Sequence, residues 1–378
     1  MTAPSPAGIV FRAAVYGGSG YADGNLDILS GLEAAGLPLQ LVPIGPQEDQ
    51  ERLLPAKRRS ALARLQRRRY DVGRSVLYQC SPAPDFETQL EARVRIGRTA
   101  FETDSLPDGW TERCNVLDQV WVPSEFNRET FSRAGVAPER LRVMPEGLDT
   151  QRFRPGLAPL PIPERRGFNF LSIFDWIDRK GPDVLLRAYV QAFHADDDVA
   201  LILKIHKFDD PQAQLEQRLM AFIERELGVP LEKAPPILVL RGLLPAAEMP
   251  RLYASADAFV LPSRGEGWGR PYLEAAATQL PVLATRWSGH LDFLHDGNSY
   301  LIDLDGVVAV PRDSDREAYI GQRWAEPSPD HLAQLMRAVV ADRTAAARRA
   351  AQARQEMVER WDSRVLAPRW SESLRALL

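Results

Sequence analysis

The chain has 378 residues, 45% of them hydrophobic, and a formal net charge of −4 at pH 7. This length is enough for two ordinary domains, each with its own core, and the charge gives no general nucleic-acid signature. The two cysteines, Cys80 and Cys114, lack a CxxC partner, so we expect a reducing compartment, with neither a disulfide framework nor a zinc site.

The N-terminal part begins with an apolar run at residues 9–16, IVFRAAVY, which predicts a buried strand. The glycine-rich sequence GGSGYADG follows at once, and residues 25–35 have the apolar spacing of a helix. Glycines allow a backbone to approach a ligand closely, so this turn could border a phosphate. The same glycines could equally serve the tight turn alone.

A basic run follows, with eight Lys or Arg residues and no acid between Arg52 and Arg69. Such a run is usually the solvated face of a helix. The alternative is attraction to an anionic membrane or to a phosphorylated acceptor, with leucines at 53, 54, 62 and 65 as an apolar face. No stretch reaches the ~20 apolar residues of a spanning helix, and the N-terminus lacks a basic n-region. We therefore expect a cytoplasmic protein, with any membrane contact peripheral.

Further strands are expected in SVLYQC, RVRIGRTAF, DQVWV and RLRVM, and a helix capped by Ser124 follows the third of these. Prolines recur between Pro145 and Pro163, which indicates a linker, and FNFLSIFD then starts a second set of strands and helices. The fold class predicted is α/β, with two doubly wound domains facing across a cleft. The expected boundaries are 1–155, 164–361 and, for a C-terminal helix, 362–378.

The loop after the strand FNFLSIFD contains Arg179, Lys180 and Gly181. It lies at the carboxyl edge of that strand, where ligands bind in open α/β sheets. A lysine is a flexible point charge suited to a diphosphate, although exposed loop lysines are common. The acidic residues 196–198 precede the next strand, at the wrong edge for a nucleotide metal, so no metal site is predicted.

The most informative stretch is residues 256–285, ADAFVLPSRGEGWGRPYLEAAATQLPVLAT. It predicts a buried strand, a pliable loop from Arg264 to Gly269, and a helix with Pro271 in its first turn. That geometry aims unpaired N–H groups and the helix dipole at a bound diphosphate. Glu266 and Glu274, separated by seven residues, suit vicinal hydroxyls of a sugar nucleotide. The alternative for Glu274 is simple stabilisation of the helix N-terminus.

The segment GEGWGRPYLEA, with ADAFVLPS and PVLAT beside it, closely resembles the E-x7-E region of the family-4 retaining glycosyltransferases. VWVPSEFNRETF and PEGLDTQRFRP are also similar to this family. The resemblance implies the GT-B architecture, with an acceptor-binding N-terminal Rossmann-like domain, a nucleotide-sugar domain, and a final helix that crosses back to the first. It implies transfer of a sugar, with retention, from a nucleotide-diphosphate sugar to an unidentified glycan, lipid-linked or small acceptor. No cofactor and no metal are implied.

By resemblance, Glu266 contacts the transferred sugar, Lys180 the donor phosphates, and Glu274 the ribose diol. The other positions that the resemblance places at the donor are Gly18, Ser19, Gly242, Leu243, Gly267, Trp268 and Gly269. Family members usually carry Gly-Arg where this sequence has Phe174-Asp175, so Arg179 is expected as the substitute cation.

All five histidines lie in the second half of the chain, so no N-terminal-domain histidine can face the sugar and no catalytic base is assigned. This absence counts against the first alternative function, a GT-B nucleotide-sugar epimerase. The second alternative is a non-catalytic sugar-nucleotide-binding paralogue, which the presence of Glu266, Lys180 and Glu274 together disfavours.

Overall fold

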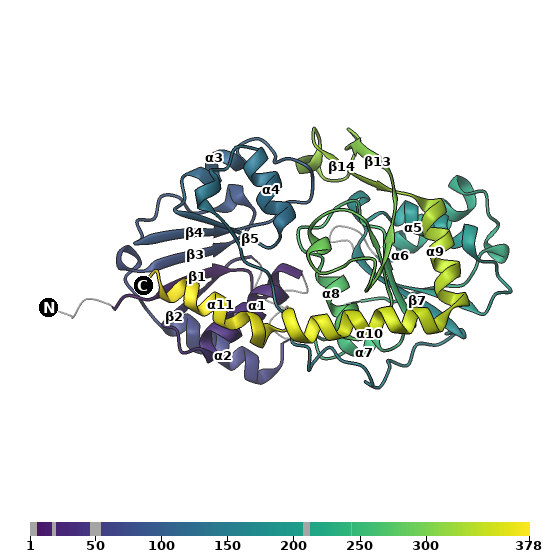
Figure 1. Ribbon diagram of the computed structural model, residues 1–378, viewed down its shortest axis with the longest axis horizontal. Coiled ribbons are helices and arrows are strands. Elements are labelled where there is room, and N and C mark those ends of the chain that lie inside the picture. The colour runs from purple at the N-terminus through teal and green to yellow at the C-terminus, as the bar shows by residue number, and fades with distance from the viewer. Residues whose placement is uncertain (1–5, 17–19, 46–53, 207–211, 243) are drawn as a thin grey trace. The chain divides into compact units, whose positions relative to one another are not determined.

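The structure is a computed structural model that describes all residues except 1–5, 17–19, 46–53, 207–211 and 243. The chain divides into two compact units, residues 1–149 with 359–378 and residues 150–358 (Figure 1). The prediction was a linker between Pro145 and Pro163, with domains at 1–155 and 164–361 and a C-terminal helix at 362–378.

The described residues of the first unit form a six-stranded parallel sheet in the order β2-β1-β3-β4-β5-β6. Its strands are β1 (Ile9–Ala13), β2 (Leu39–Pro43), β3 (Val76–Cys80), β4 (Val94–Arg98), β5 (Gln119–Val122) and β6 (Leu141–Val143). Its helices are α1 (Gly20–Ala34), α2 (Ala56–Arg67), α3 (Trp110–Asn115), α4 (Glu125–Arg133) and α11 (Ser363–Arg375). The strands coincide with the apolar runs because both faces of a parallel sheet are covered.

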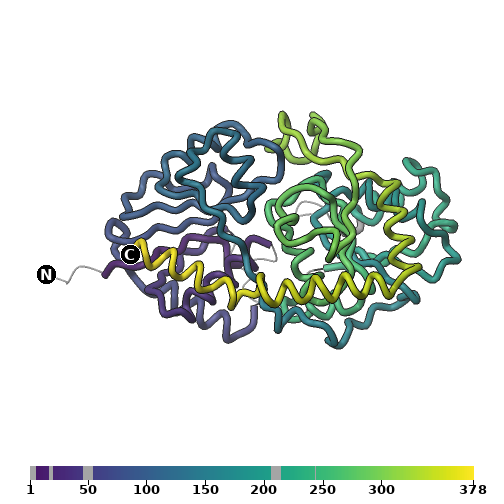
Figure 2. Tube along the Cα trace, in the orientation of Figure 1, coloured from purple at the N-terminus to yellow at the C-terminus, as the bar shows by residue number. Residues whose placement is uncertain are grey.

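The C-terminal helix α11 completes the core of this unit. It packs along α1, and the trace in Figure 2 shows this last segment, in yellow, beside the purple first helix. Trp370 of α11 is buried, and the centre of its ring lies 5.3 Å from that of Trp121. Its indole N–H donates to the carbonyl of Pro145 at 2.9 Å. Asp362 caps the helix by accepting from the amide of Arg364 at 2.8 Å.

Two predictions for the first unit concern the cap at Ser124 and the start of helix α1. The cap at Ser124 is confirmed, because its hydroxyl accepts from the amide of Asn127 at 3.3 Å. Helix α1 begins at Gly20, five residues before the expected start at Asn25. Gly24 lies inside this helix and not in a turn, and a Cβ there would lie 2.4 Å from a carboxylate oxygen of Glu146. The glycine thus leaves room for the Glu146 side chain in its present position.

The apolar face proposed for the basic run is wrong. Leu54, Leu62 and Leu65 are at most 6% exposed, and α2 packs against β2. These leucines are part of the protein core and are not available to a membrane, while the position 53 named with them lies outside the described residues. In the described part of the chain, no helix combines the length and the apolar character that crossing a bilayer demands.

The described residues of the second unit form another six-stranded parallel sheet, in the order β12-β11-β10-β7-β8-β9, and an antiparallel pair, β13-β14. Its strands are β7 (Phe168–Asp175), β8 (Val199–His206), β9 (Ile237–Val239), β10 (Ala258–Leu261), β11 (Val282–Thr285), β12 (Tyr300–Ile302), β13 (Leu304–Ala309) and β14 (Arg323–Pro327). Its helices are α5 (Pro182–Ala192), α6 (Gln212–Ala221), α7 (Met249–Tyr253), α8 (Arg270–Ala277), α9 (Pro329–Ala341) and α10 (Arg343–Arg360), which ends at the unit boundary.

The order of these strands determines where a ligand can bind. From β7 the chain proceeds outward through β8 and β9, returns to β10 on the other side of β7, and continues to β11 and β12. The direction of winding therefore reverses between β7 and β10. In open α/β sheets the crevice for ligands opens at the carboxyl edge of such a reversal. The loops that follow β7 and β10 meet there.

Candidate functional site

The loops after β7 and β10 pack closely against each other. Gly181 ends the short 3-10 turn Asp178–Lys180 with a φ of +66°, and a Cβ at this position would lie 2.2 Å from the carbonyl oxygen of Pro262. Only glycine fits both the backbone conformation and the space. The sequence Arg-Lys-Gly before the proline of α5 thus holds Lys180 against the loop that follows β10.

Lys180 and Glu266 form an ion pair at this edge. The Nζ atom of Lys180 lies 2.6 Å from Oε1 of Glu266, and Nη1 of Arg179 lies 3.6 Å from the same oxygen. Burial alone would raise the pKa of Glu266, which is 5% exposed, but Lys180 and then Arg179 outweigh burial and lower that pKa to about 2. Glu266 is therefore ionised at neutral pH.

Arg179 is largely engaged within the protein. Its guanidinium donates to the carbonyl of Gly265, lies 5.6 Å from the ring centre of Tyr319, and is buried with a relative exposure of 7%. Its position beside Glu266 places it in the site, and its bond to Gly265 fixes the loop that carries Glu266.

The loop after β11 closes the other side of Glu266. The hydroxyl of Ser288 accepts from the amide of Glu266 at 2.8 Å, and the amide of Gly289 donates to the Glu266 carbonyl at 2.9 Å. Ser288 has a φ of +94°, which is strained for a residue with a side chain. His290 is fully buried, which lowers its pKa to about 4, and one ring nitrogen lies 2.7 Å from the carbonyl of Thr285. The neutral imidazole of His290 thus helps to hold this loop in place.

Glu274 lies in the second turn of α8, near Glu266 in sequence but with different partners. One carboxylate oxygen lies 3.1 Å from Nε of Arg270, and the hydroxyl of Tyr253 donates to the other at 2.9 Å. The side chain is buried, with 7% of the residue exposed. Arg270 and Tyr253 were not predicted as site residues; they hold Glu274 in one orientation.

The other residues expected at the donor occupy the turn into α8. Gly269 is the N-cap residue with a φ of +91°, and a Cβ there would lie 2.7 Å from the ring of Tyr272. Trp268 is 5% exposed, and its ring packs 5.0 Å from that of Phe293. Gly267 is buried between Glu266 and this tryptophan. This turn can offer a ligand its backbone, because the indole packs within the unit.

Gly242 follows β9, has a φ of +74°, and is exposed, while its carbonyl accepts from Nζ of Lys204 at 2.5 Å. Gly18, Ser19 and Leu243, also expected at the donor, lie outside the described residues.

Arg264 is a further site residue that the sequence analysis did not predict. It was taken as the start of a pliable loop, but the residue is 7% exposed. Its guanidinium bonds both oxygens of Asp183, at 2.9 and 2.7 Å, and of Glu326, at 2.9 and 2.8 Å. A further N–H donates to the carbonyl of Asp178 at 2.6 Å. These bonds connect the loop of Glu266 to α5 and β14, so this part of the loop is fixed. Its partners are distant in sequence, so no local pattern could have identified it.

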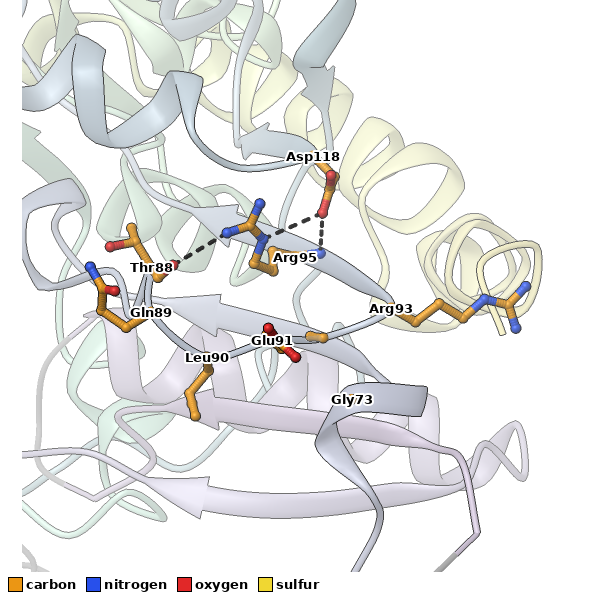
Figure 3. A pocket seen from close by; sticks show the side chains of 9 residues that line it. Gly73, Thr88, Gln89, Leu90, Glu91, Arg93, Arg95 and Asp118 are labelled. Atoms are coloured by element: carbon orange, nitrogen blue, oxygen red, sulfur yellow. Dashed lines mark hydrogen bonds and ion pairs between the residues drawn. The ribbon is translucent and has the colours of Figure 1, made fainter.

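A solvent cavity of about 480 Å³ lies elsewhere, in the first unit (Figure 3). Arg95, one of its lining residues, points toward Asp118, whose carboxylate accepts from the Arg95 amide at 2.7 Å. Both residues lie at the amino ends of β4 and β5, the edge opposite to the one where α/β sheets bind ligands. None of the predicted site residues lines this cavity. In the described ranges, no three His, Cys, Asp or Glu side chains gather as a metal site.

Residues 166–319 match the family described as glycosyl transferases group 1. Residues 166–319 of the second unit thus form a group 1 glycosyl transferase domain. This group 1 domain contains the whole Lys180–Glu266 site.

The curated relatives of the chain are also named as sugar transferases. It is 30% identical over 234 residues to the GDP-mannose-dependent alpha-(1-6)-phosphatidylinositol monomannoside mannosyltransferase of Mycolicibacterium smegmatis, an alignment that covers 56% of this chain and 58% of the relative. It is 32% identical over 197 residues to D-inositol 3-phosphate glycosyltransferase 1 of Catenulispora acidiphila, covering 49% and 43%. The chain thus spans about half the length of the curated relatives it matches.

Solved structures agree in fold over the entire chain. A crystal structure of Anabaena HepE with UDP-glucose covers 97% of this chain and 99% of its own, with a TM-score of 0.63 and 17% identity. A glycosyltransferase from Rickettsia africae covers 98% of both chains, with a TM-score of 0.64 and 13% identity. The expected fold class, two Rossmann-like α/β domains of the GT-B type, is confirmed.

Proposed function

We propose that the protein transfers a sugar, with retention of its anomeric configuration, from a nucleotide-diphosphate sugar to a hydroxyl-bearing acceptor. The observation that carries this proposal is the Lys180–Glu266 ion pair at the winding reversal of the group 1 domain. A cation and a carboxylate side by side match the two parts of such a donor, its diphosphate and its sugar hydroxyls.

In this proposal Lys180 stabilises the leaving diphosphate, on which negative charge accumulates as the glycosidic bond breaks. A preorganised ammonium and the amide groups at the start of α8 need no reorganisation when that charge develops. Glu266 accepts hydrogen bonds from hydroxyls of the transferred sugar, and Lys180 and Arg179 keep the Glu266 carboxylate ionised. Glu274, oriented by Arg270 and Tyr253, accepts from the ribose diol.

For the acceptor, the names of the relatives offer a starting point. The two described above are named for a phosphatidylinositol mannoside and for D-inositol 3-phosphate. We propose a polyhydroxylated acceptor, free or attached to a lipid, and inositol phosphates are the first compounds to assay. GDP-mannose, named for one relative, is the first donor to assay.

A lipid-attached acceptor would require contact with a membrane surface, and α2 is the candidate for it. Its leucines are buried, so contact would rely on charge alone. Arg58 and Arg64 form ion pairs with Asp27 and Glu33 of α1. Lys57, Arg67 and Arg69 are exposed and supply the charge for such contact.

The direct assay incubates the full chain with GDP-mannose or UDP-glucose and inositol phosphate acceptors, with and without EDTA. We expect release of nucleoside diphosphate and a glycosylated product whose anomeric proton coupling, read by NMR on fresh product, matches that of the donor. We expect activity in EDTA, because Lys180 and the helix amides provide the charge stabilisation. An inverted product would contradict the proposal, and donor epimerised without transfer would favour an epimerase.

A further inference from the structure

Lys204, a residue to which the proposed mechanism assigns no role, is buried at the same edge of the sheet as Lys180. It lies in β8, two residues before the strand ends, and pairs in register with Ile173 of β7. It is 8% exposed, and its Nζ atom donates to the carbonyl of Gly242 at 2.5 Å. None of the carboxylates in the described part of the chain forms an ion pair with it.

Among the described residues, the Lys204 ammonium bonds one carbonyl and no carboxylate, and a buried charge that has lost water without an ion-pair partner is costly. Burial lowers the pKa of Lys204, and Asp175, at the end of β7, offsets part of this effect. An anionic ligand would supply the missing countercharge. The alternative is a purely structural role, in which Lys204 only braces the turn that follows β9.

The position of Lys204 relative to the donor site favours a ligand. Strand β8 neighbours β7 on the side away from β10, and adjacent strands lie about 4.8 Å apart. On the other side of the reversal, the loop of Glu266 is already bonded to Ser288 and Gly289, and the carbonyl of Arg264 to β14. This leaves β8, the strand that carries Lys204, as the neighbouring strand over which a nucleotide with its diphosphate at Lys180 could extend.

A diphosphate carries at least two negative charges, of which Lys180 can balance one. Arg179, the substitute expected from the sequence, donates to Gly265 and faces Glu266. Lys204 has three N–H donors, of which the bond to Gly242 uses one. Its flexible stem allows the ammonium to turn toward a ligand at the same edge.

We propose that Lys204 is a second phosphate-binding residue, which contacts the donor diphosphate at the α-phosphate, the end that carries the nucleoside. This inference rests on the proposed function, because it assumes a nucleotide donor at Lys180. It assigns the two phosphates to cations from neighbouring strands, Lys180 after β7 and Lys204 in β8.

The test is calorimetric titration of the full chain with UDP and GDP, comparing wild type with Lys204→Met, Lys204→Arg and the control Lys233→Met. Lys233 is an exposed lysine of the same unit, in the turn before β9 and so at the opposite end of that strand from Gly242. We expect Lys204→Met to weaken binding of the diphosphate by about tenfold or more, the size of one charge-assisted contact, while Lys204→Arg and Lys233→Met stay within about threefold.

A second measurement shows whether Lys204 contacts the phosphates of the ligand, contacts its base, or only supports the turn after β9. Inorganic pyrophosphate, added as a competitor, should displace the bound diphosphate more weakly from Lys204→Met than from wild type. If pyrophosphate competes equally well with both proteins, or competes with neither, the assignment of Lys204 to a phosphate is wrong. A lower melting temperature of unliganded Lys204→Met, with loss of binding in Lys204→Arg as well, would show bracing instead. If wild type binds none of UDP, GDP, ADP and dTDP, the proposed function itself fails; unchanged binding by Lys204→Met overturns only the role of Lys204.

Discussion

The Nζ atom of Lys180 lies 2.6 Å from Oε1 of Glu266, although 86 positions separate the two residues in the chain. The contact exists because β7 and β10 are neighbours at the winding reversal, so that their loops meet. In the free protein the two charges compensate each other within a buried site. In the proposed complex, the ammonium is shared with the donor phosphates and the carboxylate with the sugar hydroxyls.

Replacing Lys180 by alanine should weaken donor binding and also slow the chemical step. Loss of one charge-assisted contact is worth about 1.5 to 3 kcal/mol, so we expect a fall of roughly ten- to a hundredfold in kcat/KM, with kcat itself reduced. Steady-state kinetics with the active donor measure both. Lys233→Ala is the matched control. Unchanged kcat in Lys180→Ala would remove leaving-group stabilisation from the role of this lysine.

Glu274→Ala should mainly raise KM for the donor, because a ribose contact is made equally in the ground state and in the transition state. Tyr253→Phe removes only the hydroxyl that orients Glu274 and should give a smaller effect in the same direction. Titration with the nucleoside diphosphate measures both variants. Normal donor affinity in both would contradict the ribose assignment.

The stability of the protein should depend on pH through Glu266. Its pKa is lowered to about 2 in the folded protein, so the unfolded chain binds more protons as the pH falls through the usual range of a glutamate. The contribution of Glu266 is complete above about pH 5 and is lost progressively toward pH 2, amounting to about 3 kcal/mol. Urea unfolding of wild type and Glu266→Gln at several pH values measures this contribution. A stability difference that does not change between pH 6 and pH 3 would speak against it.

Arg264 should be a stability determinant of the loop that carries Glu266. Arg264→Met removes bonds to Asp183 and Glu326 from a side chain that is 9% exposed, and should cost about 2 to 3 kcal/mol. Arg286 also pairs with two carboxylates, Asp296 and Asp303, but its side chain is 40% exposed. Arg286→Met should therefore cost less than about 1 kcal/mol. If chemical denaturation shows an equal loss of unfolding free energy in the two variants, the buried ion pairs of Arg264 do not stabilise the protein more than the exposed pairs of Arg286.

Contact of α2 with a membrane, if it occurs, should be electrostatic and sensitive to salt. Each basic residue near an anionic surface contributes about 1 kcal/mol, and high salt screens this attraction. Co-sedimentation should recover the protein with anionic vesicles at low salt, less at high salt, and not with neutral vesicles. Glutamine at positions 57, 67 and 69 should abolish the association. Absence from anionic pellets at low salt would leave a soluble acceptor as the better hypothesis.

The sequence predicted best those residues whose chemistry and whose position at the end of a strand can both be read from one local stretch. An apolar run followed by polar residues predicts a strand and its carboxyl end, which was enough to predict that Lys180 and Glu266 lie at the carboxyl edge of a sheet. Residues whose role depends on partners far along the chain were missed. Arg264 is one, because Asp183 and Glu326 come from different elements. Lys204 is another, because in the sequence it is one residue of a buried strand.

The proposed function requires that the Lys180–Glu266 pair is a site for a sugar nucleotide. Calorimetric titration of wild type and Lys180→Ala with UDP, GDP, ADP and dTDP tests it most directly. We predict that wild type binds at least one of these at a single site and that Lys180→Ala binds it about tenfold or more weakly. Binding of none of them by wild type, or equal binding by both proteins, would contradict the claim.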